Sequence, residues 1–203
     1  TAYVQNMLDK GNEQITMAYL YLNADVPYKA AKVMDKGLKN ESIEGTSKNW
    51  ELTGNAWRQA QELDKAIPAM EKAAAKSSKG ELYVRLGNVY LDNDQFKQSI
   101  TAINKGLSRG GVKRADTARL VLGMAYFNNE QYEKAREAFI AAGRDERSVA
   151  YADQWIGYMD SELARQKSLQ DDDVAMQEEK AALQAELMQE EPETQEGAVP
   201  EEG

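Results

Sequence analysis

Apolar residues recur along this chain at the spacing of one helix face, in pairs of stripes separated by short polar turns. The first stripe of a central pair is Tyr83, Leu86, Gly87 and Tyr90, and the second is Phe96, Ile100, Ile103 and Leu107. Each follows the i, i+3 or i+4, i+7 pattern of an amphipathic helix. The polar run Asp92–Asp94 lies between them and supplies turn residues. The pattern predicts two helices joined as a hairpin.

The hairpin pattern repeats along the chain at a nearly constant interval. Glycines mark it at Gly54, Gly87, Gly123 and Gly157, separated by 33, 36 and 34 residues. After each of the first three glycines come a small residue at +12, a bulky apolar residue at +16 and a second small residue at +19. The small residues at +12 are Ala66, Ser99 and Ala135. The bulky residues at +16 are Met70, Ile103 and Phe139, and the small residues at +19 are Ala73, Gly106 and Ala142. Helices pack closely where a small residue faces a large one, so we expect the hairpins to stack through these pairs.

The repeat gives a domain organisation. Four hairpins are predicted, at residues 11–44, 47–79, 80–112 and 116–146, followed by a capping helix at residues 148–165 that covers the last apolar face. Residues 1–10 are expected to end a helix of a preceding repeat. Residues 166–203 form an acidic tail, with a helix predicted over Val174–Gln189 and disorder from Glu190 onward.

Charge is concentrated in that tail. The chain carries a net charge of −9, and residues 171–203 hold twelve acids and one base, so the rest of the chain sums to +2. A nearly neutral body with an acidic tail gives no electrostatic reason to bind nucleic acid or an anionic membrane. The chain also has no apolar run of about 18 residues, so we expect no membrane insertion.

The chain contains no cysteine and no histidine. This excludes Ser-His-Asp and Cys-His catalysis and His-bearing zinc sites. Asp171–Asp173 lacks the spacing, glycine and closing glutamate of an EF-hand, and Gly110–Arg114 lacks the spacing of a phosphate-binding loop. The basic residues Lys105, Arg109, Lys113 and Arg114 are predicted to form a solvated loop. We therefore expect a protein that is not an enzyme, with no cofactor, no metal site and no small-molecule substrate.

The alternation of large and small residues resembles the tetratricopeptide repeat family. The resemblance is carried by Trp50-x-x-Thr53-Gly54-x-x-Trp57, Tyr83-x-x-Leu86-Gly87-x-x-Tyr90 and Leu122-Gly123-x-x-Tyr126, with the small and bulky positions that follow. It implies an all-α solenoid of about four helical hairpins plus a capping helix. In this family the first helices of the hairpins line a concave groove that binds a protein or peptide segment.

Transferred position by position, the resemblance implies a partner-binding groove formed by Tyr19, Leu22, Asn55, Arg58, Asn88, Leu91, Met124, Phe127 and Tyr158. Met124 and Phe127 would anchor a partner, unless the tail or capping helix covers them, and the polar residues would bond its backbone or polar groups. Val84 and Leu120 are neighbouring groove positions. Glu51 and Val84 stand where chaperone-binding members need lysine, which argues against a clamp for a C-terminal carboxylate.

Several stretches are similar to the C-terminal part of bacterial tetratricopeptide proteins encoded beside ExbB, ExbD and TonB homologues. They are Val26–Leu38, Glu62–Ala74, Gly80–Asp92, Val121–Asn128, Asp145–Ser148 and Gln154–Met159. This resemblance implies a periplasmic accessory of TonB-type energy transduction and iron uptake, with a TonB-, ExbB- or ExbD-type component as partner. The cytoplasm is the alternative location.

Three alternatives remain open from the sequence. The chain is a general scaffold for envelope assembly or secretion, or a hydrolase that uses only carboxylates. The third is that the acidic tail, residues 171–203, is itself the functional part and mimics an anionic ligand.

Overall fold

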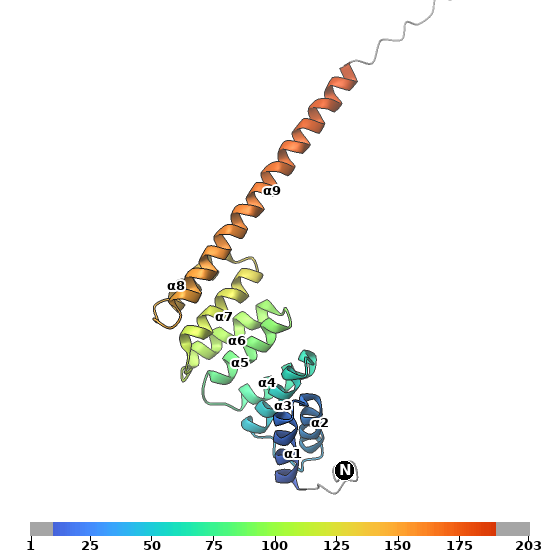
Figure 1. Cartoon of the computed structure of the whole chain (residues 1–203), viewed down its shortest axis with the longest axis vertical. Helices are drawn as coiled ribbons and strands as arrows, with labels where there is room; N and C mark the ends of the chain where they lie inside the picture. Colours follow the sequence, from blue (N-terminus) through green and yellow to red (C-terminus); the bar gives the residue numbers. More distant parts are fainter. Residues whose placement is uncertain (1–9, 190–203) are drawn as a thin grey trace, which may run out of the picture. The chain divides into compact units, whose positions relative to one another are not determined.

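The computed structural model describes residues 10–189, which form nine α-helices and no strand (Figure 1). Their bounds are α1 Gly11–Asn23, α2 Pro27–Lys39, α3 Ser47–Gln59, α4 Leu63–Ala75, α5 Glu81–Asp92, α6 Phe96–Arg109, α7 Ala115–Asn128, α8 Tyr132–Ala142 and α9 Val149–Gln189. The predicted end of a preceding helix, up to residue 9, and the predicted disorder from Glu190 onward lie outside the described residues.

The chain divides into two compact units, Thr1–Ile156 and Gly157–Gly203, and the boundary falls inside α9. In the first unit, α1 to α8 make four hairpins, and each helix packs on the next one in the chain, both within hairpins and between them. Such nearest-neighbour packing is the arrangement of a helical solenoid. The all-α solenoid expected from the sequence is therefore the fold of this unit.

The close approach of the two helices in a hairpin depends on glycine at the predicted positions. A Cβ on Gly54 would lie 2.5 Å from Cγ of Met70, and one on Gly123 would lie 2.5 Å from Cε1 of Phe139. At Gly87 a Cβ would overlap Cγ1 of Ile103. The bulky partners are fully buried. The predicted large–small pairs are therefore the contacts that hold each of these three hairpins together.

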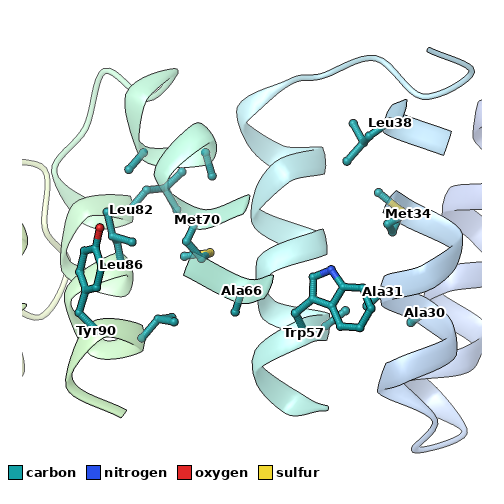
Figure 2. Close-up of a cluster of buried hydrophobic side chains, with 14 of the residues drawn as sticks. Ala30, Ala31, Met34, Leu38, Trp57, Ala66, Met70, Leu82, Leu86 and Tyr90 are labelled. Carbon is teal, nitrogen blue, oxygen red and sulfur yellow. The ribbon is translucent and has the colours of Figure 1, made fainter. Parts of the chain in front are cut away.

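The first hairpin reaches the same packing with alanine instead of glycine. Ala18 and Met34 occupy the positions that Gly54 and Met70 occupy in the second hairpin, and both are fully buried. Figure 2 shows Met34 in one continuous apolar cluster with Trp57 and Met70, which joins successive hairpins. The Trp57 indole N–H donates to Oδ2 of Asp35 at 3.2 Å, so its one polar atom is satisfied inside this cluster.

The same turn joins the two helices of all four hairpins. Shortly after the first helix ends, the backbone is left-handed, at Asp25, Gln61, Asp94 and Glu130, with φ between 54° and 59°. The next amide then donates back to a carbonyl in the last turn of the helix, as Val26 to Tyr21, Glu62 to Trp57, Gln95 to Tyr90 and Gln131 to Tyr126, at 2.8–3.0 Å. This is the Schellman arrangement, which satisfies helix-end carbonyls.

The C-terminal region differs from the expectation that the capping helix ends at Arg165. Helix α9 runs without a break from Val149 to Gln189. The sequence between Gly157 and Pro192 contains neither glycine nor proline, so nothing in it stops a helix once one has formed. No helix of the described residues is long and apolar enough to cross a membrane.

Gly157 also departs from the repeat that it seemed to extend. It is exposed, and a Cβ placed on it would meet no atom within 4 Å. From Gly157 to residue 186 every side chain is exposed except Met159, which is fully buried, and Glu162 and Leu163, which are partly buried. The fourth glycine therefore makes no large–small pair.

Candidate polypeptide-binding surface

Eight of the nine residues proposed to bind a partner lie on the first helices of the four hairpins. Tyr19 and Leu22 are on α1, Asn55 and Arg58 on α3, Asn88 and Leu91 on α5, and Met124 and Phe127 on α7. We call these eight residues the A-helix surface. The ninth, Tyr158, is 54% exposed and belongs to the second unit, so it is not counted in this surface.

Two asparagines occupy the middle of the A-helix surface. Asn55 and Asn88 are each half-buried, at equivalent positions of successive repeats. Oδ1 of Asn88 is shielded from solvent and accepts no hydrogen bond from any described residue. Leaving such an acceptor unsatisfied costs about 1–3 kcal/mol. The surface therefore carries an acceptor whose hydrogen bond is not made within the described residues, on a side chain that is itself only half-buried.

Two ion pairs tie α3 to α5 on either side of the asparagines. Arg85 binds Glu51 through its guanidinium, and Nε of Arg58 lies 2.6 Å from Oδ2 of Asp92. In both pairs the partners are separated by one repeat in the sequence. Arg58 was expected to contact a partner molecule, but the structure places it in an internal ion pair. It remains 42% exposed, so its other guanidinium nitrogens keep access to solvent.

The apolar end of the surface is less open than the sequence suggested. Met124 and Phe127 are half-buried, and the Phe127 ring lies 5.6 Å from that of Tyr132 on α8 at an angle of 60°. The neighbouring positions Val84 and Leu120 are buried and contribute to the core instead. Tyr19, at the other end, is 42% exposed. Apolar contact area is therefore offered in patches and not as a continuous stripe.

Sequence reasoning did not identify Arg85 or Asp116 as organising residues. Arg85 binds Glu51 and also lies 3.5 Å from Glu81. Asp116 is buried at the start of α7, where it binds Arg114 and accepts a hydrogen bond from Ser148 Oγ at 2.8 Å. The spacing of one repeat from Glu51 to Arg85 was a usable signal. The pairing of Asp116 with Ser148 left no pattern in the sequence.

Asp116, Asp145 and Glu162 offer fixed negative charge, because each is bound to an arginine. The Arg114 guanidinium holds the pKa of Asp116 far below its usual range, and Arg147 lowers the pKa of Asp145 in the same way. Hydrogen bonds from Arg165 and Gln166 lower the pKa of Glu162 to about 2. Within residues 10–189 no cluster of three or more acidic groups is arranged to hold a metal ion.

The family comparison matches part of the chain. Residues 84–156 match the family model described as a tetratricopeptide repeat. This match runs from α5 to the beginning of α9 and ends at Ile156, the last residue of the first unit. No curated protein sequence matches the chain.

Solved structures with a similar fold cover more of the chain. MamA (residues 41 to the end) from Desulfovibrio magneticus RS-1 superposes with a TM-score of 0.65 at 20% identity, covering 90% of this chain and 98% of MamA. YrrB, described as a tetratricopeptide protein with an unusual peptide-binding site, gives a TM-score of 0.58 at 20% identity, covering 74% and 76%. The C-terminal part of a repeat-containing protein from Cytophaga hutchinsonii gives 0.55 at 17% identity, covering 68% and 54%. At these identities the comparisons establish the fold.

Proposed function

We propose that this chain, which carries tetratricopeptide repeats over residues 84–156, is an interaction scaffold that binds a polypeptide segment on its A-helix surface. The observation that supports this most directly is the unsatisfied Oδ1 of Asn88. Because that atom is shielded from solvent, the half-buried side chain would rotate to present it, and a backbone amide of a bound segment would then donate to it and remove the cost of the bare acceptor. Asn55, one repeat earlier, offers a second polar side chain to the same segment.

The two ion pairs between α3 and α5 favour binding because they order the surface around these asparagines before a partner binds. Arg85 with Glu51 and Arg58 with Asp92 link side chains of α3 to side chains of α5. A surface that is already ordered loses less conformational entropy on binding. Leu91, Met124 and Phe127 would then supply apolar contact area on α5 and α7. The proposed peptide-binding role agrees with the description of YrrB, which has a similar fold.

We further propose that the partner is a TonB-, ExbB- or ExbD-type component and that the protein acts in the periplasm. The support is the similarity of the stretches named above, such as Glu62–Ala74 and Val121–Asn128, to proteins encoded with those systems. A general envelope-assembly or secretion scaffold is the rival within binding proteins. Both would use the A-helix surface.

A carboxylate-only hydrolase is disfavoured by the charge arrangement. Such an enzyme needs a carboxylic acid that stays protonated near neutral pH, facing a second carboxylate. Asp116 and Asp145 line one cavity, but both have lowered pKa values because each is bonded to an arginine. Neither is suited to act as the acid.

The substitution Asn88→Leu should reduce partner binding without reducing the stability of the fold. The substitution keeps the side-chain size and removes the unsatisfied acceptor, so we expect the protein to be as stable or about 1 kcal/mol more stable. Recovery of the partner on immobilised protein from an extract of the source cell envelope should fall strongly. The matched control is Asn104→Leu. Asn104 is an exposed asparagine on α6, the second helix of the same hairpin and outside the A-helix surface, so this substitution should leave recovery unchanged.

The result tests separately the proposed binding surface and the proposed TonB-type partner. Undiminished recovery by the Asn88→Leu protein would reject the A-helix surface as the binding site. Recovery of assembly factors, with no TonB-type component, through an Asn88-dependent contact would reject only the TonB assignment. Loss of binding on deletion of residues 171–203, with no effect of Asn88→Leu, would favour the acidic tail as the functional part.

A further inference from the structure

A cavity of about 340 Å³ in the first unit is lined mainly by charged side chains. It lies where the connection from α6 to α7, the first turns of α7 and the segment after α8 meet. Its charged residues are Lys113, Asp116, Arg119, Arg144, Asp145 and Arg147. We call it the cation pocket. None of the eight residues of the A-helix surface lines it.

Both carboxylates of the cation pocket already have cationic partners. Arg114 donates to both carboxylate oxygens of Asp116, from Nε to Oδ1 at 3.0 Å and to Oδ2 at 3.2 Å and from Nη2 to Oδ2 at 2.6 Å, and Ser148 Oγ also donates to Oδ2. Arg147 donates to Asp145 from Nε to Oδ1 at 2.9 Å and from Nη2 to Oδ2 at 2.7 Å. Each acid is therefore matched by one arginine in bidentate geometry, which is a strong pairing.

Three cations are left over. The charged groups of Lys113, Arg119 and Arg144 make no ion pair and no side-chain hydrogen bond with any described residue. Glu81 also contacts this loop: its Oε2 accepts the Lys113 backbone amide at 3.0 Å, while its Oε1 lies 3.5 Å from Arg85. The six charged residues that line the pocket sum to +2, and Arg114, bound to Asp116 beside it, raises the excess to three positive charges. Like charges held around one cavity repel each other, and an anion in the cavity would relieve that repulsion.

The basic cluster expected in this loop is divided by the fold. Nζ of Lys105 lies 4.5 Å from the centre of the Tyr83 ring, and the Arg109 guanidinium lies 5.2 Å from it. Arg114 is bound to Asp116. Only Lys113 from that cluster reaches the pocket, where Arg119 and Arg144 join it from α7 and from the segment after α8.

The pocket offers cationic side chains, which pair well with carboxylates. Two backbone amides of its loop are not free to cradle a phosphate, because the Gly110 amide donates to Leu107 and the Lys113 amide donates to Glu81. Residues 1–170 sum to only +2, which gives no extended positive charge to attract a long polyanion such as nucleic acid. We infer that the cation pocket binds acidic side chains of a partner polypeptide, as a second contact site that does not depend on the A-helix surface.

The test uses the full chain labelled with ¹⁵N and titrated with an N-acetylated tetraglutamate peptide at low salt. Backbone amides of residues 112–119 and 141–147 should shift with saturation, and tetraglutamine should cause no shift. Arg119→Gln with Arg144→Gln should weaken the affinity roughly tenfold, because two charge-assisted hydrogen bonds are lost. The matched control, Lys39→Gln with Lys76→Gln, makes the same change in net charge at exposed sites away from the pocket.

Several results would overturn the inference. These are equal affinity in the pocket and control variants, no saturable shift with tetraglutamate, and a saturable shift with inorganic phosphate alone. Thermal unfolding followed by circular dichroism should give the same midpoint for both double variants. If the pocket double variant does not fold, the exposed single variant Arg144→Gln carries the test, with Lys76→Gln as its control and a smaller loss expected.

Discussion

The hairpins of the first unit and the part of α9 beyond Gly157 are both fully helical but are stabilised in different ways. In the hairpins, helices of 11–14 residues bury apolar side chains against their neighbours. Helices this short are marginal in isolation, so tertiary packing must hold them. From Gly157 to residue 186 nearly every side chain is exposed, and helix formation there depends on residue propensity and local pairs.

The comparison shows that a glycine at the interval of the repeat can lie in two different structural environments. At Gly87 it permits a close helix contact, and at Gly157 it lies on an exposed face. What separates the two is the helix that follows. A second helix turns back after α5, whereas α9 continues in one direction through Gln189. Paired substitutions in the two regions can therefore break or sharpen the comparison.

The largest contrast should come from removing a large apolar side chain. Phe139 is fully buried, and its ring stacks on Trp155 at 5.6 Å with an interplanar angle of 11°. Phe139→Ala should lower the free energy of unfolding by about 3–5 kcal/mol. Leu169→Ala removes a side chain that is 51% exposed and should change it by less than about 0.5 kcal/mol. Urea unfolding followed by tryptophan fluorescence measures both, and equal losses would contradict the contrast.

The same substitution at the two glycines should have opposite signs. Gly87→Ala forces a Cβ into Ile103 and within 3.2 Å of the Ser99 carbonyl oxygen, so we expect a loss of about 2 kcal/mol. Gly157→Ala meets no neighbour and should favour the helix by up to about 1 kcal/mol. Thermal unfolding by circular dichroism at 222 nm checks the sign. A stabilising Gly87→Ala would show that the hairpin contact is looser than described.

Acid should affect the buried carboxylate of the first unit. The folded pKa of Asp116 is depressed, chiefly by Arg114, so its stabilisation is complete above the unfolded pKa near 4 and is lost as the pH falls toward the folded pKa. Asp116→Asn should cost about 1.5 kcal/mol at pH 7 and flatten this acid dependence. The measurement is urea unfolding between pH 2 and pH 7. An unchanged pH profile in the variant would remove Asp116 as its cause.

The smallest effect should come from the hairpin turns. Gln61 adopts φ of 59°, a left-handed conformation that favours glycine. Gln61→Gly should raise the free energy of unfolding by about 0.5–1 kcal/mol. The adjacent Glu62, with φ of −97°, is the control, because glycine there adds freedom to the unfolded chain, removes the ion pair with Lys65 and should destabilise. A gain at Glu62 or a loss at Gln61 would contradict the assignment of the turn.

The sequence was sufficient for the fold because the repeat encodes its contacts locally. The spacing from Gly87 to Ile103 already specified which residue of one helix faces which residue of the next. The length of α9 was missed because the repeat pattern changes after Arg165, whereas the absence of glycine and proline lets the helix continue. Two features depend on how successive hairpins stack, which the spacing within one hairpin does not determine. They are the ion pair of Arg58 with Asp92 and the grouping of Arg119 with Arg144.

The most direct measurement for the binding proposal is site-specific photo-crosslinking in the source cells. A photoreactive residue replaces Leu91 or Phe127 on the A-helix surface, or the exposed Thr101 on α6 as the control, and crosslinked peptides are identified by mass spectrometry. We expect both surface positions to capture one segment of the same partner polypeptide and the control position to capture none of it. Capture at Thr101 alone, or capture of unrelated proteins at all three positions, would contradict the proposed function.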